Sequence, residues 1–144
     1  MKKLIPVATG LVAALAFTAA LAGEKIQLVE RALTDATLDL GAKGDSVGDI
    51  MTWANPVFDA ANKVQVGTDQ GFCIRVLVGK LWECTWTTML KDGQISVEGP
   101  FKDEGDAVVA VIGGTGKYAG AKGQLKLHPR DAKATAYDFI FDLL

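Results

Sequence analysis

The sequence predicts an all-β protein whose strands form an eight-stranded antiparallel up-and-down barrel, and three observations lead to this prediction. Nearly every segment after residue 22 alternates apolar and polar side chains with a period of two, as strands with one buried face do. No segment shows convincing helical spacing of its apolar side chains. The strand segments are long and joined by short links, which is typical of a barrel rather than of a sandwich of short strands.

The eight expected strands can be assigned in order along the chain. They cover residues 26–33, 49–58, 63–77 (interrupted at Gly67), 81–90, 94–101, 106–112, 118–127 and 135–143. Pro56 cannot donate a hydrogen bond to a neighbouring strand, so we expect a break or bulge at Asn55–Pro56. Glycine-rich connections are expected at 41–49 and 113–123, because glycine accepts the backbone angles of tight turns. The Lys91-Asp92-Gly93 sequence is typical of a hairpin turn.

Residues 1–22 have the composition of a secretory signal peptide. Lys2 and Lys3 form its positive start, residues 11–21 its apolar stretch, and residues 20–22 its small-residue cleavage site. The apolar stretch is short for a membrane span, so we expect cleavage; a retained anchor is the alternative. The mature chain, residues 23–144, would then be one barrel domain in the periplasm or outside the cell, with no integral membrane span.

The charge pattern narrows the classes of partner. The chain has 15 basic and 17 acidic side chains, and loss of Lys2 and Lys3 with the signal peptide would make it more acidic. The basic residues are scattered and form no patch with aromatic side chains, which argues against nucleic acid as a partner. His128 is the single histidine and has no further ligands at metal-binding spacing, so we expect no metal site. The acidic residues near Gly105 and within 45–49 are expected to be solvated turns.

Glu30 is the first candidate for a functional role. Its place in the alternation puts it on the same strand face as Ile26 and Leu28, whereas Arg31 points the other way. Burial on an apolar face would raise the pKa of its carboxyl group and prepare it for acid–base chemistry. The alternative is a carboxylate at the mouth of the barrel that faces solvent or pairs with a lysine.

Cys73 and Cys84 are the only cysteines, and they lie on neighbouring expected strands. If the hairpin between these strands is centred on residues 78–79, the two cysteines lie opposite each other and can form a disulfide. Disulfides are frequent in exported proteins, so we expect this bridge. The alternative is a free, positioned thiol at Cys73.

The same hairpin places Arg75 opposite Trp82, as a cation–π pair. Trp86 shares the strand face of Trp82 and Cys84, so these side chains could form an aromatic wall with one cation for a carboxylate or phenol ligand. The alternative is a core arginine neutralised by Glu30, or one that reaches the rim of the barrel. The aromatic stripe of the last strand, which includes Tyr137 and Phe139, is expected in the core or in a subunit contact.

Five short motifs follow one another along the chain. They are Gly48-Asp49, Asn55, Gly71-Phe72-Cys73, SVEGPF at 96–101 and GGTGKYAGAKGQ at 113–124. In this order they resemble the allene oxide cyclase and dirigent superfamily of eight-stranded barrels. The resemblance extends over about residues 28–143. It implies an interior that binds a small hydrophobic, oxygenated molecule and steers its cyclisation or coupling. It also implies no metal or organic cofactor held by the barrel, and often a trimer.

The resemblance assigns roles to single residues. Glu30 matches the glutamate that allene oxide cyclases place near the reacting group, and Asn55 matches an asparagine that holds a water molecule there. The alternative for Asn55 is a turn residue that caps its own backbone. Cys73 matches a cysteine of the barrel interior, and Phe101 stands where allene oxide cyclases have a tyrosine, so we expect Phe101 to provide packing. A second water-holding asparagine of the family is replaced by Ala32, which weakens an epoxide-cyclising interpretation.

The sequence thus predicts an exported barrel that binds a small hydrophobic molecule, with catalysis left open. If the protein is an enzyme, we expect a cyclase or isomerase with Glu30 and Asn55 as catalytic residues. Ligand contacts are expected from Cys73, Arg75, Trp82, Trp86 and Phe101. The alternatives are a binding protein without turnover and a structural barrel whose interior is filled by side chains.

Overall fold

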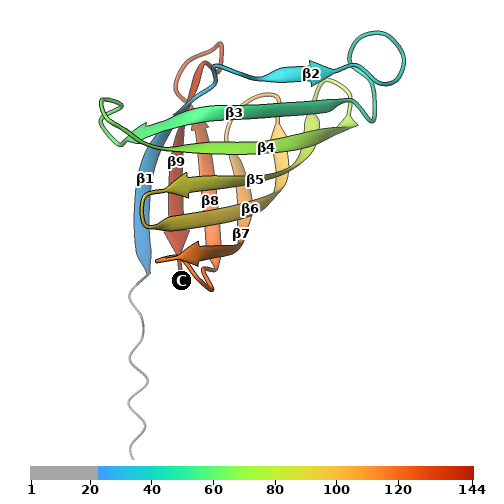
Figure 1. Cartoon of the computed structure of the whole chain (residues 1–144). Coiled ribbons are helices and arrows are strands. Elements are labelled where there is room, and N and C mark those ends of the chain that lie inside the picture. The colour runs from blue at the N-terminus through green and yellow to red at the C-terminus, as the bar shows by residue number, and fades with distance from the viewer. Residues whose placement is uncertain (1–22) are drawn as a thin grey trace, which may run out of the picture.

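The computed structural model describes residues 23–144, which contain nine β-strands and no helix (Figure 1). The strands are β1 (Glu24–Arg31), β2 (Ala36–Leu38), β3 (Ile50–Asp59), β4 (Gln65–Leu77), β5 (Leu81–Leu90), β6 (Gly93–Lys102), β7 (Ala107–Gly116), β8 (Gly123–Pro129) and β9 (Ala136–Leu143). Among these residues there is no helix with the length and hydropathy needed to cross a membrane. The proposed signal peptide, residues 1–22, lies outside the described part of the chain.

Eight of the strands close into an antiparallel barrel, which confirms the predicted fold class. Each of the strands β3 to β8 pairs with the next one along the chain, and β1 pairs with both β9 and β3. The closing pair runs from Leu28 opposite Asp59 to Glu30 opposite Val57. The short strand β2 adds to β3 outside this ring, with Ala36 opposite Thr52 (Figure 1).

The interior of the barrel is filled from alternate positions of each strand. On β4, for example, Cys73 and Arg75 are buried whereas Phe72 and Ile74 between them are exposed. The centre of the core consists of side chains with almost no exposed surface, such as Ile95, Val97, Leu125 and Phe141. Each large apolar side chain buried in this way stabilises the fold by about 1.5–3 kcal/mol. The period-two pattern of the sequence is therefore the physical basis of the barrel.

Three expected boundaries are wrong. Strand β3 runs through Asn55–Pro56 without a break, and its irregularity lies further on, between Val57 and Phe58. Strand β7 extends through the glycine cluster to Gly116, so the turn is confined to residues 117–122 and β8 begins only at Gly123. Position 114 of this strand requires glycine, because a Cβ there would lie 2.4 Å from the carbonyl oxygen of Tyr118.

Candidate functional site

The barrel encloses a cavity of about 90 Å³ that is half open to solvent. Strands β1, β3, β4, β5, β6 and β9 supply most of its lining, together with the segment that follows β1. The lining residues are Glu30, Asp35, Met51, Trp53, Asp69, Cys73, Cys84, Trp86, Phe101, Tyr137 and Phe139. We call this site the acidic cavity, because three of its side chains are carboxylic acids and none is basic.

Glu30 lies on the inner face of β1, where the alternation predicted it. Its side chain is 4% exposed and lies between β3 and β9, with Val57 and Tyr137 at the paired positions. Burial above all, together with the nearby Asp69 and Asp35, raises the pKa of Glu30 to about 9, although a hydrogen bond from Asn55 opposes the shift. Glu30 therefore holds a proton at neutral pH.

Asn55 fixes the position of Glu30 through a fully used amide group. The backbone N–H groups of Leu33 and Thr34 donate hydrogen bonds to Asn55 Oδ1, over 3.0 Å and 2.9 Å. These two bonds identify the oxygen of the amide, so the nitrogen faces the acids. Asn55 Nδ2 donates one hydrogen bond to Glu30 Oε1 and another to Asp35 Oδ1, 2.7 Å away.

Asp35 is exposed, so it marks the open side of the acidic cavity. It lies in the segment between β1 and β2, which Asn55 holds against the barrel. Asn55 thus acts as the link between this segment and the buried Glu30. The alternative role of Asn55, a turn residue that caps its own backbone, does not agree with these contacts, because the partners of its side chain lie in other segments.

Asp69 is a second buried acid that the sequence analysis did not single out. Its side chain has no exposed surface, and its backbone lies opposite Asn55 on β3. Trp53 Nε1 donates a hydrogen bond of 2.9 Å to Asp69 Oδ2, whereas Asp69 Oδ1 has no hydrogen-bond partner in the described residues. Burial raises the pKa of Asp69 to about 7. Glu30 and Asp69 therefore form an acid pair that does not carry two negative charges at neutral pH.

Aromatic rings form the apolar side of the cavity. The rings of Trp53 and Trp86 meet edge to face with centroids 6.0 Å apart, and Phe139 lies 6.3 Å from Trp86. Gly71 makes this arrangement possible, because a Cβ at position 71 would lie 2.3 Å from the Cβ of Trp86. Phe101 contacts Tyr137 edge to face at 5.8 Å. The last strand thus contributes cavity lining as well as core.

The disulfide between Cys73 and Cys84 is confirmed. The two residues are direct partners in the pairing of β4 and β5, and their Cα atoms lie 4.0 Å apart. Both cysteines line the acidic cavity, so Cys73 contributes a bridged sulfur to its wall rather than a free thiol.

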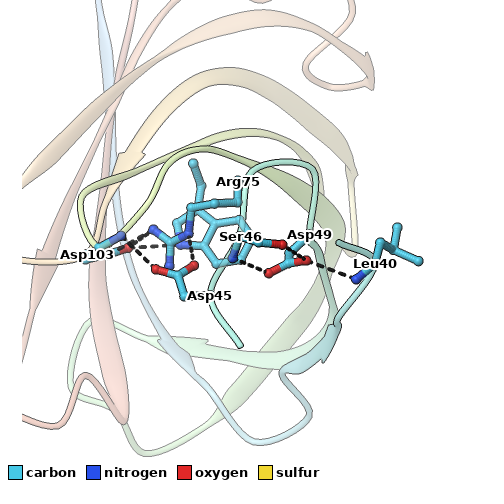
Figure 2. Close-up of polar contacts among 8 residues, drawn as sticks. Leu40, Asp45, Ser46, Asp49, Arg75 and Asp103 are labelled. Atoms are coloured by element: carbon cyan, nitrogen blue, oxygen red, sulfur yellow. Dashed lines mark hydrogen bonds and ion pairs between the residues drawn. The ribbon is translucent and has the colours of Figure 1, made fainter. Parts of the chain in front are cut away.

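Arg75 and Trp82 lie outside the acidic cavity, in a second polar group. The predicted cation–π pair is confirmed: the Arg75 guanidinium lies 3.8 Å from the centre of the Trp82 ring. Arg75 also forms ion pairs with Asp45, at 2.6 Å, and with Asp103, at 2.7 Å (Figure 2). Trp82 Nε1 donates a hydrogen bond to the same Asp103. We call these four residues the Arg75 cluster.

The loop before β3 closes over the barrel through this cluster. Asp45 belongs to that loop, and the backbone of Arg75 exchanges hydrogen bonds with Gly48 and Asp49. Asp49 is buried and accepts hydrogen bonds from the backbone of Leu40 and Ser46, which lower the pKa of its carboxyl group (Figure 2). The expectation of a solvated turn at residues 45–49 is therefore wrong for Asp49, whereas Asp45 is exposed as expected. The alternative in which Glu30 neutralises Arg75 is also wrong, because Arg75 pairs with Asp45 and Asp103.

Part of what the sequence analysis missed had a signal in the alternation. Asp69 has the same parity as Cys73, and Trp53 the same parity as Asn55, so both belonged to inward-facing sets. Asp35 had no such signal, because it lies in an irregular segment whose path depends on contacts distant in the sequence.

Comparisons with known proteins agree with this architecture. A pyocyanin demethylase of known structure is 26% identical, with a TM-score of 0.74 over 84% of this chain and 100% of that one. The pterocarpan synthase dirigent protein PsPTS1 is 13% identical, with a TM-score of 0.72 over 85% of this chain and 94% of its own. The Diels Alderase AbmU from Streptomyces koyangensis is 16% identical, with a TM-score of 0.65 over 85% of this chain and 63% of its own.

The family assignment rests on the sequence itself. Residues 25–132 match the allene oxide cyclase family, a span that begins in β1 and ends after β8 and so includes most of the barrel. All the acids of the cavity lie within that span. The chain therefore belongs to the allene oxide cyclase family.

Proposed function

We propose that this protein binds a small, mostly apolar, oxygenated molecule in the acidic cavity and steers its cyclisation or isomerisation. The observation that carries the proposal is a buried glutamic acid with no basic partner at the wall of a cavity. Burial of such a group lowers the stability of the fold, and groups of this kind are concentrated at functional sites. A position beside aromatic rings is suited to an apolar ligand with one polar atom.

Glu30 would act as the general acid. Because its pKa is raised to about 9, it holds a proton that it can donate to an oxygen atom of the ligand. Asp69, whose pKa is raised to about 7, can accept a proton from another position of the same ligand. The ligand receives one proton from Glu30 and gives one to Asp69, so its composition does not change. The acid pair therefore suits an isomerisation or a ring closure.

Asn55 would be a positioning residue in this scheme. Its amide is saturated by Glu30, Asp35 and the backbone of residues 33 and 34, so it holds the acid in place. Trp86, Phe101 and the Cys73–Cys84 bridge would form the apolar contacts with the ligand. Arg75 and Trp82 would act indirectly, because they keep the loop that precedes β3 closed.

The relatives support a ligand in the interior without selecting the reaction. Their names describe a demethylase that acts on pyocyanin, a pterocarpan synthase and a Diels Alderase. These are different reactions carried by one fold, so the choice among them depends on the residues of the cavity.

The size of the cavity favours a second candidate, a barrel that binds a ligand without turnover. The volume of about 90 Å³ is below the roughly 150 Å³ that encloses a benzene ring in an engineered protein cavity. A ligand would therefore lie partly in the cavity and extend through its open side. In this candidate, Glu30 serves only to donate a hydrogen bond to the ligand.

We also propose that the protein is exported and forms a homo-oligomer, a trimer by family resemblance. The disulfide supports export, because disulfides persist in oxidising compartments. The outer face of β4 supports association, because Phe72, Ile74 and Val76 are each more than 40% exposed there. N-terminal sequencing of the protein recovered from its compartment and light scattering of the purified protein test the two statements.

Native mass spectrometry of protein purified from its own compartment tests the proposed function. We expect a co-purified small molecule in the wild type and a weaker signal in Glu30→Gln. Glu83→Gln is the matched control, since Glu83 is exposed on the outer face of β5. The identity of the molecule then allows a turnover assay, which separates the cyclase from the binding protein. Absence of any ligand, with equal behaviour of the two variants, would contradict the proposal.

A further inference from the structure

The acids of the cavity have no cationic partner, unlike the two aspartates of the Arg75 cluster. Asp45 and Asp103 share Arg75, whereas Glu30, Asp35 and Asp69 have no lysine, arginine or histidine among the residues that line their cavity. A positive charge from outside the protein would be attracted to this site over several ångströms.

One carboxylate oxygen of the cavity, Asp69 Oδ1, lacks a hydrogen-bond partner in the described residues. Asp69 is fully buried and Trp53 binds its Oδ2, but Oδ1 has no hydrogen-bond partner in the described part of the chain. A buried carboxylate oxygen without a partner is costly to the fold. Asp69 is one of the residues that line the cavity, so a donor on a ligand there would lie close to this carboxylate.

The aromatic rings around this oxygen suit a cation as well. Trp53 and Trp86 both line the cavity and cross edge to face, and Tyr137 and Phe139 lie on its β9 side. The face of an aromatic ring, and that of tryptophan most of all, attracts a nearby positive charge. Carboxylates combined with aromatic faces are a suitable environment for an organic cation.

We propose that the acidic cavity selects ligands that carry a compact organic cation, such as a protonated amine or an alkylated ring nitrogen, with Asp69 as its counter-ion. The inference rests on the proposed function and names the substrate class of that same site. A metal ion fits less well, because no three His, Cys, Asp or Glu side chains within residues 23–144 are placed to hold one.

Binding of a cation is then linked to release of a proton. The titratable groups that face Asp69 across the cavity are Glu30 on β1, Asp35 after β1 and Tyr137 on β9. Burial raises the pKa of Tyr137 to about 12, so this hydroxyl stays neutral. Asp69 ionises more readily than Glu30, so the cation pairs with Asp69 and the displaced proton passes to solvent. Glu30 keeps its proton and remains available as the general acid.

Binding of three simple probes tests the inference. N-methylpyridinium and toluene have the same shape and differ in charge, and benzoate supplies the opposite charge. Dissociation constants are measured by NMR and by the fluorescence of the cavity tryptophans, at about pH 8 and about pH 5.5. We expect N-methylpyridinium to bind about tenfold more tightly than toluene at the higher pH, and to lose most of this preference at the lower pH.

Two variants test whether Asp69 causes the preference for the cation. Asp69→Asn is expected to weaken binding of N-methylpyridinium about tenfold and to leave toluene unchanged. Asp142→Asn, which removes a partly exposed carboxylate outside the cavity, should change neither. Circular dichroism checks that both variants fold.

The results distinguish a failure of the cation preference from a failure of the proposed function. If toluene or benzoate binds as tightly as N-methylpyridinium, or if Asp69→Asn keeps the preference for the cation, the inference is wrong and the cavity remains a ligand site. If none of the three probes binds, both the inference and the proposed function are overturned.

Discussion

The barrel contains two groups of charged side chains, each with buried members, that differ in whether a cation is present. In the Arg75 cluster, the buried guanidinium lies between Asp45 and Asp103 (Figure 2). It also stacks on Trp82. In the acidic cavity, Glu30 and Asp69 have amide and indole donors but no cation. Both groups draw on β4, where Asp69 and Arg75 point to the same interior.

The comparison shows how one fold separates structure from function. Opposite charges in contact stabilise each other, so the guanidinium of Arg75 has its partners within the protein. Glu30 and Asp69 have no such partner, and they must either retain a proton or receive a positive charge. The two acids line the cavity inside the barrel, whereas the Arg75 cluster secures the loop before β3 and lines a separate pocket.

Removal of the Arg75 guanidinium is expected to have the largest effect on stability among the structural variants. Arg75→Met leaves Asp103 and Asp45 without a partner and removes the stacking on Trp82. We expect the free energy of unfolding to fall by about 2–4 kcal/mol, somewhat less than for a fully buried pair because both aspartates keep contact with water. Urea denaturation measures the change. Arg130→Met is the control, because its more exposed pair with Asp138 should contribute less than about 1 kcal/mol.

Ligand binding by the Arg75→Met variant tests whether the Arg75 cluster takes part in the ligand site. If the cluster is purely structural, the folded fraction of this variant should bind a ligand of the cavity with nearly the wild-type dissociation constant. A loss of affinity at temperatures where the variant is fully folded would show that Arg75 takes part in the site.

The disulfide lies between the two groups on β4 and is expected to have the next largest effect. Reduction, or replacement of Cys73 and Cys84 by alanine together, frees a loop closed by residues 11 apart. We expect a loss of about 2–3 kcal/mol in the free energy of unfolding. Denaturation with and without a reductant measures it; equal midpoints for the wild type would contradict the prediction.

Gly71→Ala is expected to disturb the acidic cavity alone. A Cβ at this position would lie 2.3 Å from the Cβ of Trp86 and 2.4 Å from the carbonyl oxygen of Thr85, so the tryptophan must move. We expect destabilisation by about 1–3 kcal/mol and a changed Trp86 fluorescence spectrum. Unchanged fluorescence and stability would show that the two tryptophans are less tightly placed than the structure describes.

Glu30→Gln is expected to be the most informative change, because its effect on stability is small at acidic pH and grows as the pH rises. Because the pKa of Glu30 is higher in the folded state than in the unfolded state, the folded protein holds the extra proton between these values. Its stability should therefore fall as pH rises from about 4.5 to about 9, by up to about 1.4 kcal/mol per pH unit for one proton. Glutamine imitates the protonated acid, so the variant should lose most of this slope and become more stable than the wild type as the pH rises, by up to about 5 kcal/mol near pH 8.

Thermal or urea denaturation across this pH range measures both curves. Parallel curves for the wild type and Glu30→Gln would contradict the account of Glu30. The exposed Glu83→Gln variant should follow the wild type throughout.

Alternation and strand pairing made much of this molecule predictable. The period of two placed Glu30 on the inner face of β1, and the hairpin centre placed Cys73 opposite Cys84 and Arg75 opposite Trp82. These are local consequences of the backbone geometry of paired strands, so they follow from the sequence without knowledge of the rest of the fold.

The contacts that could not be predicted come from irregular segments. The loop before β3 brings Asp45 to Arg75, and the segment after β1 brings Asp35 to Asn55, each across a long stretch of chain. Alternation also fixes a face but not a depth, so it did not decide whether Glu30 is buried or at the mouth. Strand β2 was missed because three exposed residues carry no burial pattern.

The most direct test of the central claim is a titration of side-chain carboxyl groups by NMR. The account predicts that Glu30 stays protonated through neutral pH and titrates near its raised pKa of about 9. Asp49, which accepts hydrogen bonds from the backbone N–H groups of Leu40 and Ser46, should titrate with a pKa below its usual range. Titration of Glu30 near pH 4.5, like an ordinary exposed glutamate, would mean that the acidic cavity is balanced after all. The proposed role of Glu30 as an acid would then be wrong.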